Sequence, residues 1–191
     1  GDELAVLEPL RGKIPDEVFT REYRSPSSAD GGMRPNLVRA LQLLEQAGWV
    51  VRNLRLVNAQ TGQPMAFEIL LDDPNFERIT LPFVKNLERL GVTARVRTVD
   101  SAQYEYRMKQ FDFDMTVILL QQSLSPGNEQ VDFFAAVSAD TPGSRNVAGI
   151  RDPAVDRLIE LVISAPDGPS LVARTRALDR VLLWGHYVIP H

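Results

Sequence analysis

The chain has 191 residues, 44% of them hydrophobic and 24% charged, a composition that can bury the core of one medium-sized globular domain and is not that of a disordered chain. The net charge is −4 and the basic residues are scattered along the chain, so there is no basic footprint for a nucleic-acid backbone and nucleic acid is not an expected partner. The absence of cysteine excludes thiol catalysis, disulfides and Cys-ligated metals, and no apolar run approaches the roughly 20 residues of a membrane helix.

Residues 1–34 are predicted to be irregular. Residues 3–20 contain two prolines among short apolar clusters without a sustained period, which indicates a segment laid over a surface. Residues 23–34 are rich in Ser, Gly and Pro, the composition of an exposed loop. The chain opens on Gly1-Asp2-Glu3 rather than on a signal peptide, so we expect either a cytosolic protein or a piece of an exported one.

Helices are predicted from apolar stripes at helical spacing and from residues that favour helix ends. The first helix begins near Pro35 and ends at Gly48, which suits a left-handed cap. Further helices are expected where an aspartate precedes a first turn, because its side chain can accept from the backbone N–H groups there. These aspartates are Asp73, Asp100, Asp152 and Asp167.

Three strands are predicted in the body of a mixed sheet, at residues 67–71, 92–99 and 115–120. The first closes a hairpin that starts at Asn53 and turns at Thr61-Gly62. A helix separates the first two strands, so they should be parallel. The third is apolar or β-branched throughout, which indicates the central strand, buried on both faces.

The predicted fold class is therefore α/β, with flanking helices on a mixed sheet. We expect a single domain over residues 1–191, with its core at 35–185 and the start of a further strand at 186–191.

A polar stretch follows the predicted central strand. Ligands of open α/β sheets bind beyond the carboxyl ends of the strands, so this stretch is the expected ligand site, although an ordinary loop would have the same composition. Its members are Gln121, Gln122, Ser123, Leu124 and Ser125.

Three further residues are candidates for ligand contact. Arg145 and Asn146 lie in a 14-residue loop at 138–151, long enough in a compact domain to indicate a function. An arginine there can pair bidentately with a carboxylate, but a surface salt bridge or a turn explains it equally well. Tyr104 is predicted to face inward from its helix, where a tyrosine is more often a core residue than a ligand contact.

No pattern points to catalysis, a metal or a cofactor. Asp112 and Asp114 alternate as paired acid and base groups can, but they flank Phe113 at the start of a strand, away from the expected site. His186 and His191 have no Ser, Cys or carboxylate motif beside them. The alternative of an α/β enzyme, a hydrolase or a transferase, is disfavoured because there is neither a Gly-x-Ser-x-Gly elbow nor a phosphate-binding glycine loop.

Six short motifs, each weak alone, occur in the order and spacing of one protein family. They are ALQLLEQAGW (40–49), GQP (62–64), LERLGV (87–92), FDFDM (111–115), NVAGIRDPAVDRLI (146–159) and VIP (188–190). The chain resembles the family 5 extracellular solute-binding proteins, the oligopeptide- and dipeptide-binding receptors of ABC importers. The segments SLSPGNE (123–129) and GSRN (143–146) are most similar to the YejA-like branch of that family.

The resemblance implies the second lobe of a larger, two-lobed periplasmic binding protein of type II. Its implied role is to capture a peptide between two lobes and to deliver it to the permease subunits of an ABC importer in the membrane, with no chemistry. The implied location is the periplasm, and the implied state is a monomer.

The expected ligand loop departs from the family pattern. Many members that bind peptides carry an acidic residue in this loop, in a pattern like Ala-Asp-Tyr-x-x-Pro, and it pairs with the free amino terminus of the ligand. Residues 121–126 contain no carboxylate here. Because a buried ammonium without a counter-charge is unfavourable, this loop predicts a ligand with a neutral or blocked terminus, or one whose amine is held by the other lobe.

Overall fold

The computed structural model describes residues 1–29 and 31–190. The single domain that we expected is divided between two compact units. One is Pro26–Leu119, called here the sheet unit, and the other joins Gly1–Ser25 to the residues from Leu120 onward and is called the helical unit. The buried apolar clusters of each unit lie within that unit, so each closes a core of its own.

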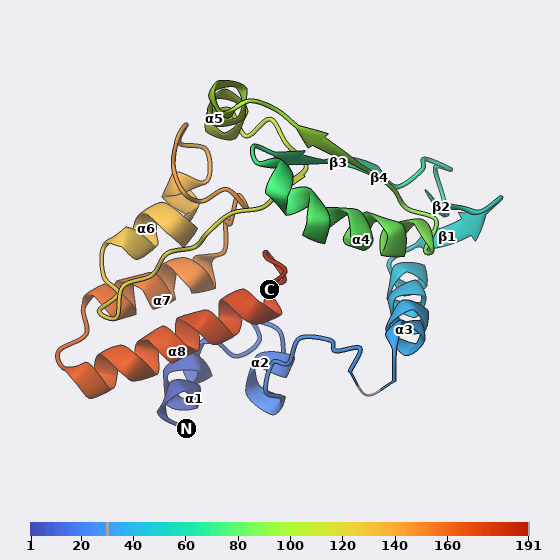
Figure 1. Ribbon diagram of the computed structural model, residues 1–191. Helices are drawn as coiled ribbons and strands as arrows, with labels where there is room; N and C mark the ends of the chain where they lie inside the picture. Colours follow the sequence, from blue (N-terminus) through green and yellow to red (C-terminus); the bar gives the residue numbers. More distant parts are fainter. Residues whose placement is uncertain (30, 191) are drawn as a thin grey trace. The chain divides into compact units, whose positions relative to one another are not determined.

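The sheet unit begins with a helix and three successive strands, after which helices and strands alternate (Figure 1). Its elements are α3 (Met33–Gln46), β1 (Trp49–Arg52), β2 (Arg55–Asn58), β3 (Ala66–Leu71), η2 (Pro74–Phe76), α4 (Glu77–Glu88), β4 (Thr93–Thr98), α5 (Ser101–Lys109) and β5 (Met115–Thr116).

Its three-stranded sheet has the order β4-β3-β5 and is parallel throughout. The α/β class and the parallel pairing of the two strands that flank α4 are confirmed. The sheet itself is not mixed, because antiparallel strands occur in a separate sheet of β1 and β2.

The prediction of a central strand at 115–120 is wrong. The centre is β3, and β5 is an edge strand of two residues, paired through Ile69–Met115 and Leu70–Thr116. β3 ends at Leu71, one residue beyond the Leu70–Thr116 pair, so among the described strands none continues beside the residues after Val117. Leu119 is accordingly exposed.

Side chains of β3 alternate between two differently covered faces of the sheet. Ile69 and Leu71 pack with Val84 of α4 on one face. Glu68 points to the opposite face and contacts Arg107 of α5. α4 and α5 therefore lie on opposite sides of the sheet (Figure 1).

The antiparallel hairpin lies one strand earlier than predicted. β1 pairs with β2 from Trp49–Asn58 to Arg52–Arg55, while β2 meets the segment before β3 in the single bridge Val57–Pro64. The turn of two residues, Asn53 at φ 50° and Leu54 at φ 64°, has the left-handed backbone that tight hairpins prefer. The sequence did not predict this turn, because leucine is not one of the residues that favour turns.

The helical unit packs α1, α7 and α8 around one core. Its elements are α1 (Asp2–Leu7), η1 (Glu8–Leu10), α2 (Glu17–Thr20), α6 (Glu129–Phe134), η3 (Ala136–Ser138), α7 (Pro153–Ile163) and α8 (Gly168–Trp184). The four predicted caps of both units are confirmed, since Asp73, Asp100, Asp152 and Asp167 each accept a backbone N–H of the first turn at 2.8–2.9 Å.

The irregular leading segment predicted at 1–34 is instead helical over much of its first 20 residues. Leu7, Leu10 and Val18 are buried in the core of the helical unit. Arg180 of α8 donates to the Val18 carbonyl and so ties α2 to α8. Helices of one or two turns are too short to show an apolar period, so the sequence pattern misses them.

The predicted start of a strand at 186–191 is also wrong for its described part, because residues 186–190 form no strand. His186 lies at φ 53° directly after α8, a left-handed conformation that turns the chain. His191 lies outside the described residues.

We expect Gly91→Ala to destabilise the chain strongly. Gly91 has φ +84°, and a Cβ there would lie 2.7 Å from the backbone nitrogen of Leu56. That nitrogen donates to the Gly91 carbonyl at 2.8 Å, so the two backbones cannot separate without breaking this hydrogen bond. The left-handed backbone alone costs an alanine about 1 to 2 kcal/mol, and the clash adds to this. Urea unfolding measures the loss.

Gly48→Ala is the matched control, because Gly48 also has φ +84° but would place its Cβ in open space. It should show the conformational cost alone. Equal destabilisation by the two variants would contradict the close approach of Gly91 to β2.

Candidate functional site

The predicted ligand loop, residues 121–125, is exposed and belongs to the helical unit. The Gln122 Oε1 atom accepts from Gln130 Nε2 at 2.6 Å, and the Ser123 Oγ atom accepts from the Ser125 backbone nitrogen at 3.0 Å. The Leu124 side chain is fully exposed, at 103% of its reference area. The loop thus presents amides, hydroxyls and one free apolar side chain.

Two residues of α6 that the sequence analysis did not select support this loop. Gln130 is buried, and its amide nitrogen also donates to the Glu129 carboxylate at 3.3 Å. The Glu129 carboxylate accepts from the Gly127 backbone nitrogen at 2.9 Å, and this bond is the main cause that lowers the pKa of Glu129. An ionised carboxylate therefore lies close behind a loop that has none of its own. The sequence shows a glutamine in a polar segment at position 130, but only the structure shows that this glutamine is buried.

Asn146 and Arg145, neighbours in the predicted functional loop, have opposite surroundings. Asn146 is 0% exposed, and its side chain makes three hydrogen bonds of 2.9–3.0 Å to the backbone of Ala135 and Ile150. These bonds fix the conformation of the loop from its buried side. Arg145 is exposed and lies 3.8 Å from the Asp132 carboxylate, with its guanidinium 5.2 Å from the centre of the Phe133 ring.

Tyr104 belongs to the sheet unit, where its hydroxyl is used to hold β5. The Tyr104 oxygen lies 2.9 Å from Thr116 Oγ1 and donates to the Val117 carbonyl at 3.3 Å. Burial raises the pKa of Tyr104, so the phenol keeps its proton and can donate. A ligand contact by Tyr104 stays a prediction.

The two alternating aspartates also hold the sheet together. Arg107 donates to the Asp112 carboxylate and to the Glu68 carboxylate, at 2.9 Å each. The Asp114 carboxylate accepts from the Glu68 backbone nitrogen at 2.9 Å. Ion pairs and backbone contacts thus occupy both aspartates.

The structure offers no grouping for metal chemistry or membrane spanning within its described residues. No set of three His, Asp or Glu side chains in 1–29 and 31–190 is placed to hold a metal ion. None of the helices in these ranges is long and apolar enough to cross a membrane. His186 packs against the rings of Tyr23 and Trp184, with centroid distances of 6.2 and 6.1 Å.

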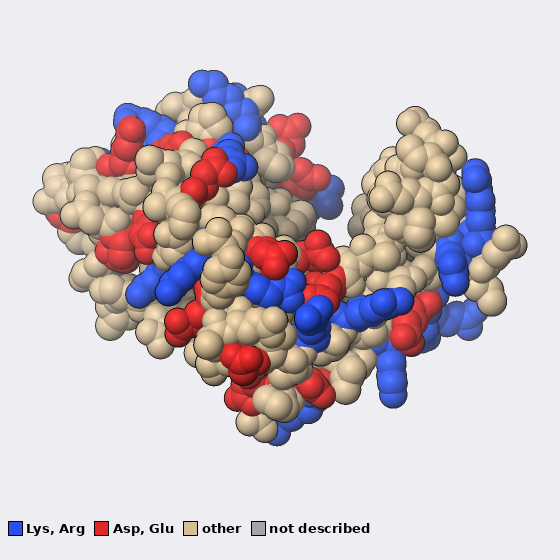
Figure 2. Space-filling view, turned by 90° about the horizontal axis from the view of Figure 1, so that it is seen from above, with Lys and Arg blue, Asp and Glu red and all other residues tan. Residues whose placement is uncertain are grey.

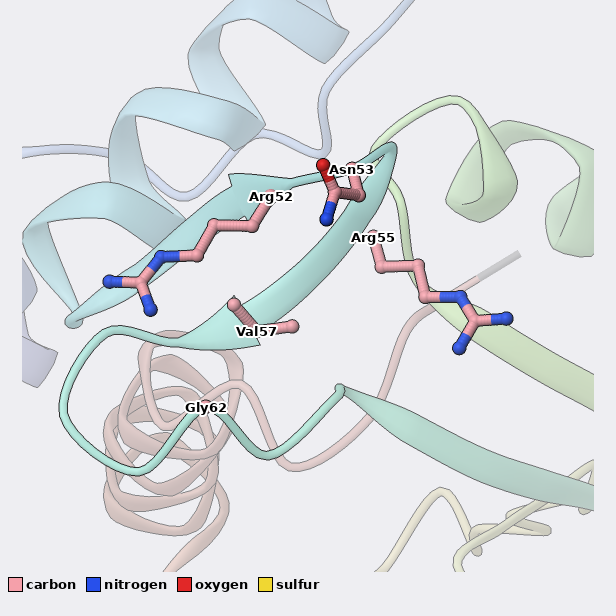
Figure 3. Close-up of a pocket in the computed structure, with 5 residues that line it drawn as sticks. All are labelled: Arg52, Asn53, Arg55, Val57 and Gly62. Atoms are coloured by element: carbon pink, nitrogen blue, oxygen red, sulfur yellow. The ribbon is translucent and has the colours of Figure 1, made fainter.

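An open cavity of about 480 Å³ lies at the β1–β2 hairpin of the sheet unit (Figure 3). Its lining consists of Arg52, Asn53, Arg55, Val57 and Gly62. None of these residues was predicted as a ligand contact, because only the pairing of β1 with β2 brings Arg52 and Arg55 side by side.

Comparison with known proteins decides the family. The model of the bacterial extracellular solute-binding proteins, family 5 Middle, matches residues 14–141. The chain belongs to this family. The resemblance drawn from the six motifs is therefore confirmed.

Two of its longer relatives are named for binding. The chain is 49% identical over 191 residues to the probable peptide-binding protein YejA of Agrobacterium fabrum. The matched region covers 100% of this chain and 31% of that protein. It is 38% identical over 189 residues to the peptidoglycan-binding protein YepA of the same organism, and the matched region covers 98% of this chain and 31% of that protein. The chain thus spans less than a third of the length of these family members.

A solved structure of a longer protein has a similar fold over most of this chain. The oligopeptide-binding protein AppA of Bacillus subtilis, in complex with a nonapeptide, superposes with a TM-score of 0.72 at 19% identity, over 97% of this chain and 38% of that one. At this identity the likeness shows the fold alone. It confirms the expected α/β fold class.

We expect Asn146→Ala to lower the free energy of unfolding by about 3 kcal/mol. The variant leaves the Ala135 carbonyl and both backbone groups of Ile150 without their partner in the interior, and each such buried polar group costs about 1 to 3 kcal/mol before the loop relaxes. Chemical denaturation of the chain measures the change.

Arg145→Ala is the control from the same loop. Its exposed ion pair should be worth less than about 1 kcal/mol. If Asn146→Ala unfolds at the same denaturant concentration as Arg145→Ala, the structural role given to Asn146 is wrong.

Proposed function

We propose that the chain is a ligand-binding lobe of a periplasmic receptor that captures a peptide and delivers it to the permease of an ABC importer. The observation that carries this proposal is the family membership, together with a relative at 49% identity that is named for peptide binding. The loop at 121–125 supports it, because exposed amides and hydroxyls suit the backbone groups of a peptide. The rest of the receptor would supply the opposing lobe.

An α/β enzyme is not favoured. The carboxylates that could act in acid and base chemistry, Asp112 and Asp114, are engaged in holding α5 and β5 against β3. The candidate residues of the loop are amides, hydroxyls and Leu124, which bind but neither attack a substrate nor transfer protons readily at neutral pH.

We further propose that the peptide has a blocked amino end. The loop has no carboxylate at 121–126, and the nearby Glu129 is engaged by Gly127 and Gln130. A relative at 38% identity is named for binding peptidoglycan. The peptides of that polymer are attached to sugar through their amino ends and so carry no ammonium there. An acylated peptide of this kind would suit a loop without a counter-charge.

Replacing Gln122, Ser123 and Ser125 together by alanine should weaken binding in the full-length receptor. Each neutral hydrogen bond contributes about 0.5 to 1.5 kcal/mol net, so we expect a loss of about 1.5 to 4.5 kcal/mol, roughly 10- to 2000-fold in Kd. Isothermal titration calorimetry of the full-length receptor with a peptide that it binds measures the change in Kd. A double alanine variant of Gln42 and Gln46, both exposed on α3, should bind normally. An unchanged Kd of the triple variant would remove this loop from the site.

A peptide with an acetylated amino end should bind the receptor more tightly than the same peptide with a free one. Without a counter-charge, the ammonium must lose water on binding and gains no ion pair in return. Competition between the two peptides measures the preference. Glu129→Gln should leave this preference unchanged. Tighter binding of the free peptide, lost in Glu129→Gln, would show that Glu129 is the counter-charge and that the blocked-end proposal is wrong.

A further inference from the structure

The tip of the β1–β2 hairpin exposes a strained apolar residue. Leu54 has φ 64°, and its side chain is 90% exposed. A non-glycine residue with a left-handed backbone is uncommon, and leucine gains no local hydrogen bond there as asparagine can. Leu54 therefore stabilises neither the turn, whose left-handed backbone is unfavourable for leucine, nor the core, because its side chain is exposed. Val51, the last but one residue of β1, is also half-exposed.

Two arginines border this tip. Arg52 and Arg55 are directly opposite each other in the register of the hairpin. Like charges in facing positions destabilise a strand pair. In the described part of the chain neither arginine has an acidic partner, and Arg52 donates to the Ala59 carbonyl at 3.3 Å. The hairpin therefore carries an uncompensated positive pair.

The positive charge extends beyond the hairpin. Residues 33–62 contain four arginines, Arg34, Arg39, Arg52 and Arg55, and a single acidic residue, Glu45, in a chain whose net charge is −4. Figure 2 shows basic side chains along the part of the molecule at the right of the view, where Figure 1 places α3 and the hairpin. This local excess attracts an anionic surface.

The side-chain directions argue against a small anionic ligand. In Figure 3 the side chains of Arg52 and Arg55 extend to opposite sides of the hairpin end, with Val57 and Gly62 between them. A small carboxylate or phosphate would need guanidinium groups that converge on it. Diverging arginines on either side of an apolar tip suit an extended anionic surface.

The apolar residues favour a lipid surface over a protein. Leucine and valine are under-represented among the residues that dominate protein interfaces. Leucine is, in contrast, a residue that enters the boundary between headgroups and acyl chains, while arginines keep their charged ends at the phosphates. Leu54 between Arg52 and Arg55 matches this arrangement.

We infer that the β1–β2 hairpin is a weak attachment site for anionic phospholipid membranes. Leu54 enters the headgroup region, and Arg52 and Arg55 contact lipid phosphates on either side. Such an attachment would keep the receptor near the membrane in which its importer lies. The inference rests on the proposed function in one respect, namely that a receptor of an importer works near a membrane. A vesicle experiment contains no peptide, so its failure and that of a peptide titration are separate results.

Co-sedimentation with vesicles of phosphatidylcholine, with and without phosphatidylglycerol, tests the inference on the 191-residue chain. We expect the chain to sediment with the anionic vesicles and to be released by high salt, which screens the attraction. Arg52→Gln with Arg55→Gln should lower the partition coefficient by about 30-fold, because each arginine near an anionic surface contributes about fivefold.

Leu54→Asn separates the membrane role from folding. Asparagine adopts the left-handed backbone more readily than leucine, so the variant should unfold at the same or a higher urea concentration. Its partition coefficient should nevertheless fall by about tenfold, because the apolar tip is lost.

Arg78→Gln with Arg95→Gln is the matched charge control, since both arginines are exposed in the same unit but outside the hairpin. This variant should bind vesicles like the unaltered chain. Equal loss in the two double variants would show a nonspecific charge effect and overturn the inference. So would an absence of binding to anionic vesicles, or normal binding by Leu54→Asn. Binding by the chain but not by the full-length receptor would also overturn it, because the hairpin would then be covered.

Discussion

Side-chain hydrogen bonds reinforce the backbone pairing that holds the short edge strand β5 in the sheet unit. β5 has two residues, yet Thr116 donates to the Leu70 carbonyl, and Asp114 accepts from the Glu68 nitrogen, both at 2.9 Å. Arg107 adds the ion pair that joins α5 to β3. Each such bond contributes about 1 kcal/mol, and together they replace the ladder that a longer strand would form. The chain that leaves β5 for the candidate loop starts from this anchored point.

The candidate loop is organised by groups that are themselves withdrawn from solvent. Gln130 is buried and directs Gln122, while Asn146 is buried and closes the neighbouring loop around Ile150. Their amides have donors and acceptors in a fixed arrangement, so a few residues can order a segment that has no strand or helix. A loop ordered in this way loses less conformational freedom when it binds a ligand.

The β1–β2 hairpin shows features that stability alone would not favour. Its turn contains a left-handed leucine, and its last pair joins two arginines. Strained and uncompensated residues persist where the surrounding structure determines them, and they are concentrated at functional positions. The adjoining approach of Gly91 to Leu56 provides that surrounding structure, because it fixes β2 against the end of α4 by a backbone hydrogen bond.

The sequence by itself determined what depends on neighbouring residues. The aspartate caps, the glycine at the end of α3, the parallel pairing around α4 and the family followed from local patterns and their spacing. Only the tertiary structure decided that β3 rather than β5 is the centre of the sheet, that the first 20 residues complete the core of the helical unit, and that Asn146 is buried. An apolar run has the same composition at the centre and at the edge of a sheet. Its position depends on which strands pair with it, and here the partner strand β3 ends at Leu71, more than forty residues before β5.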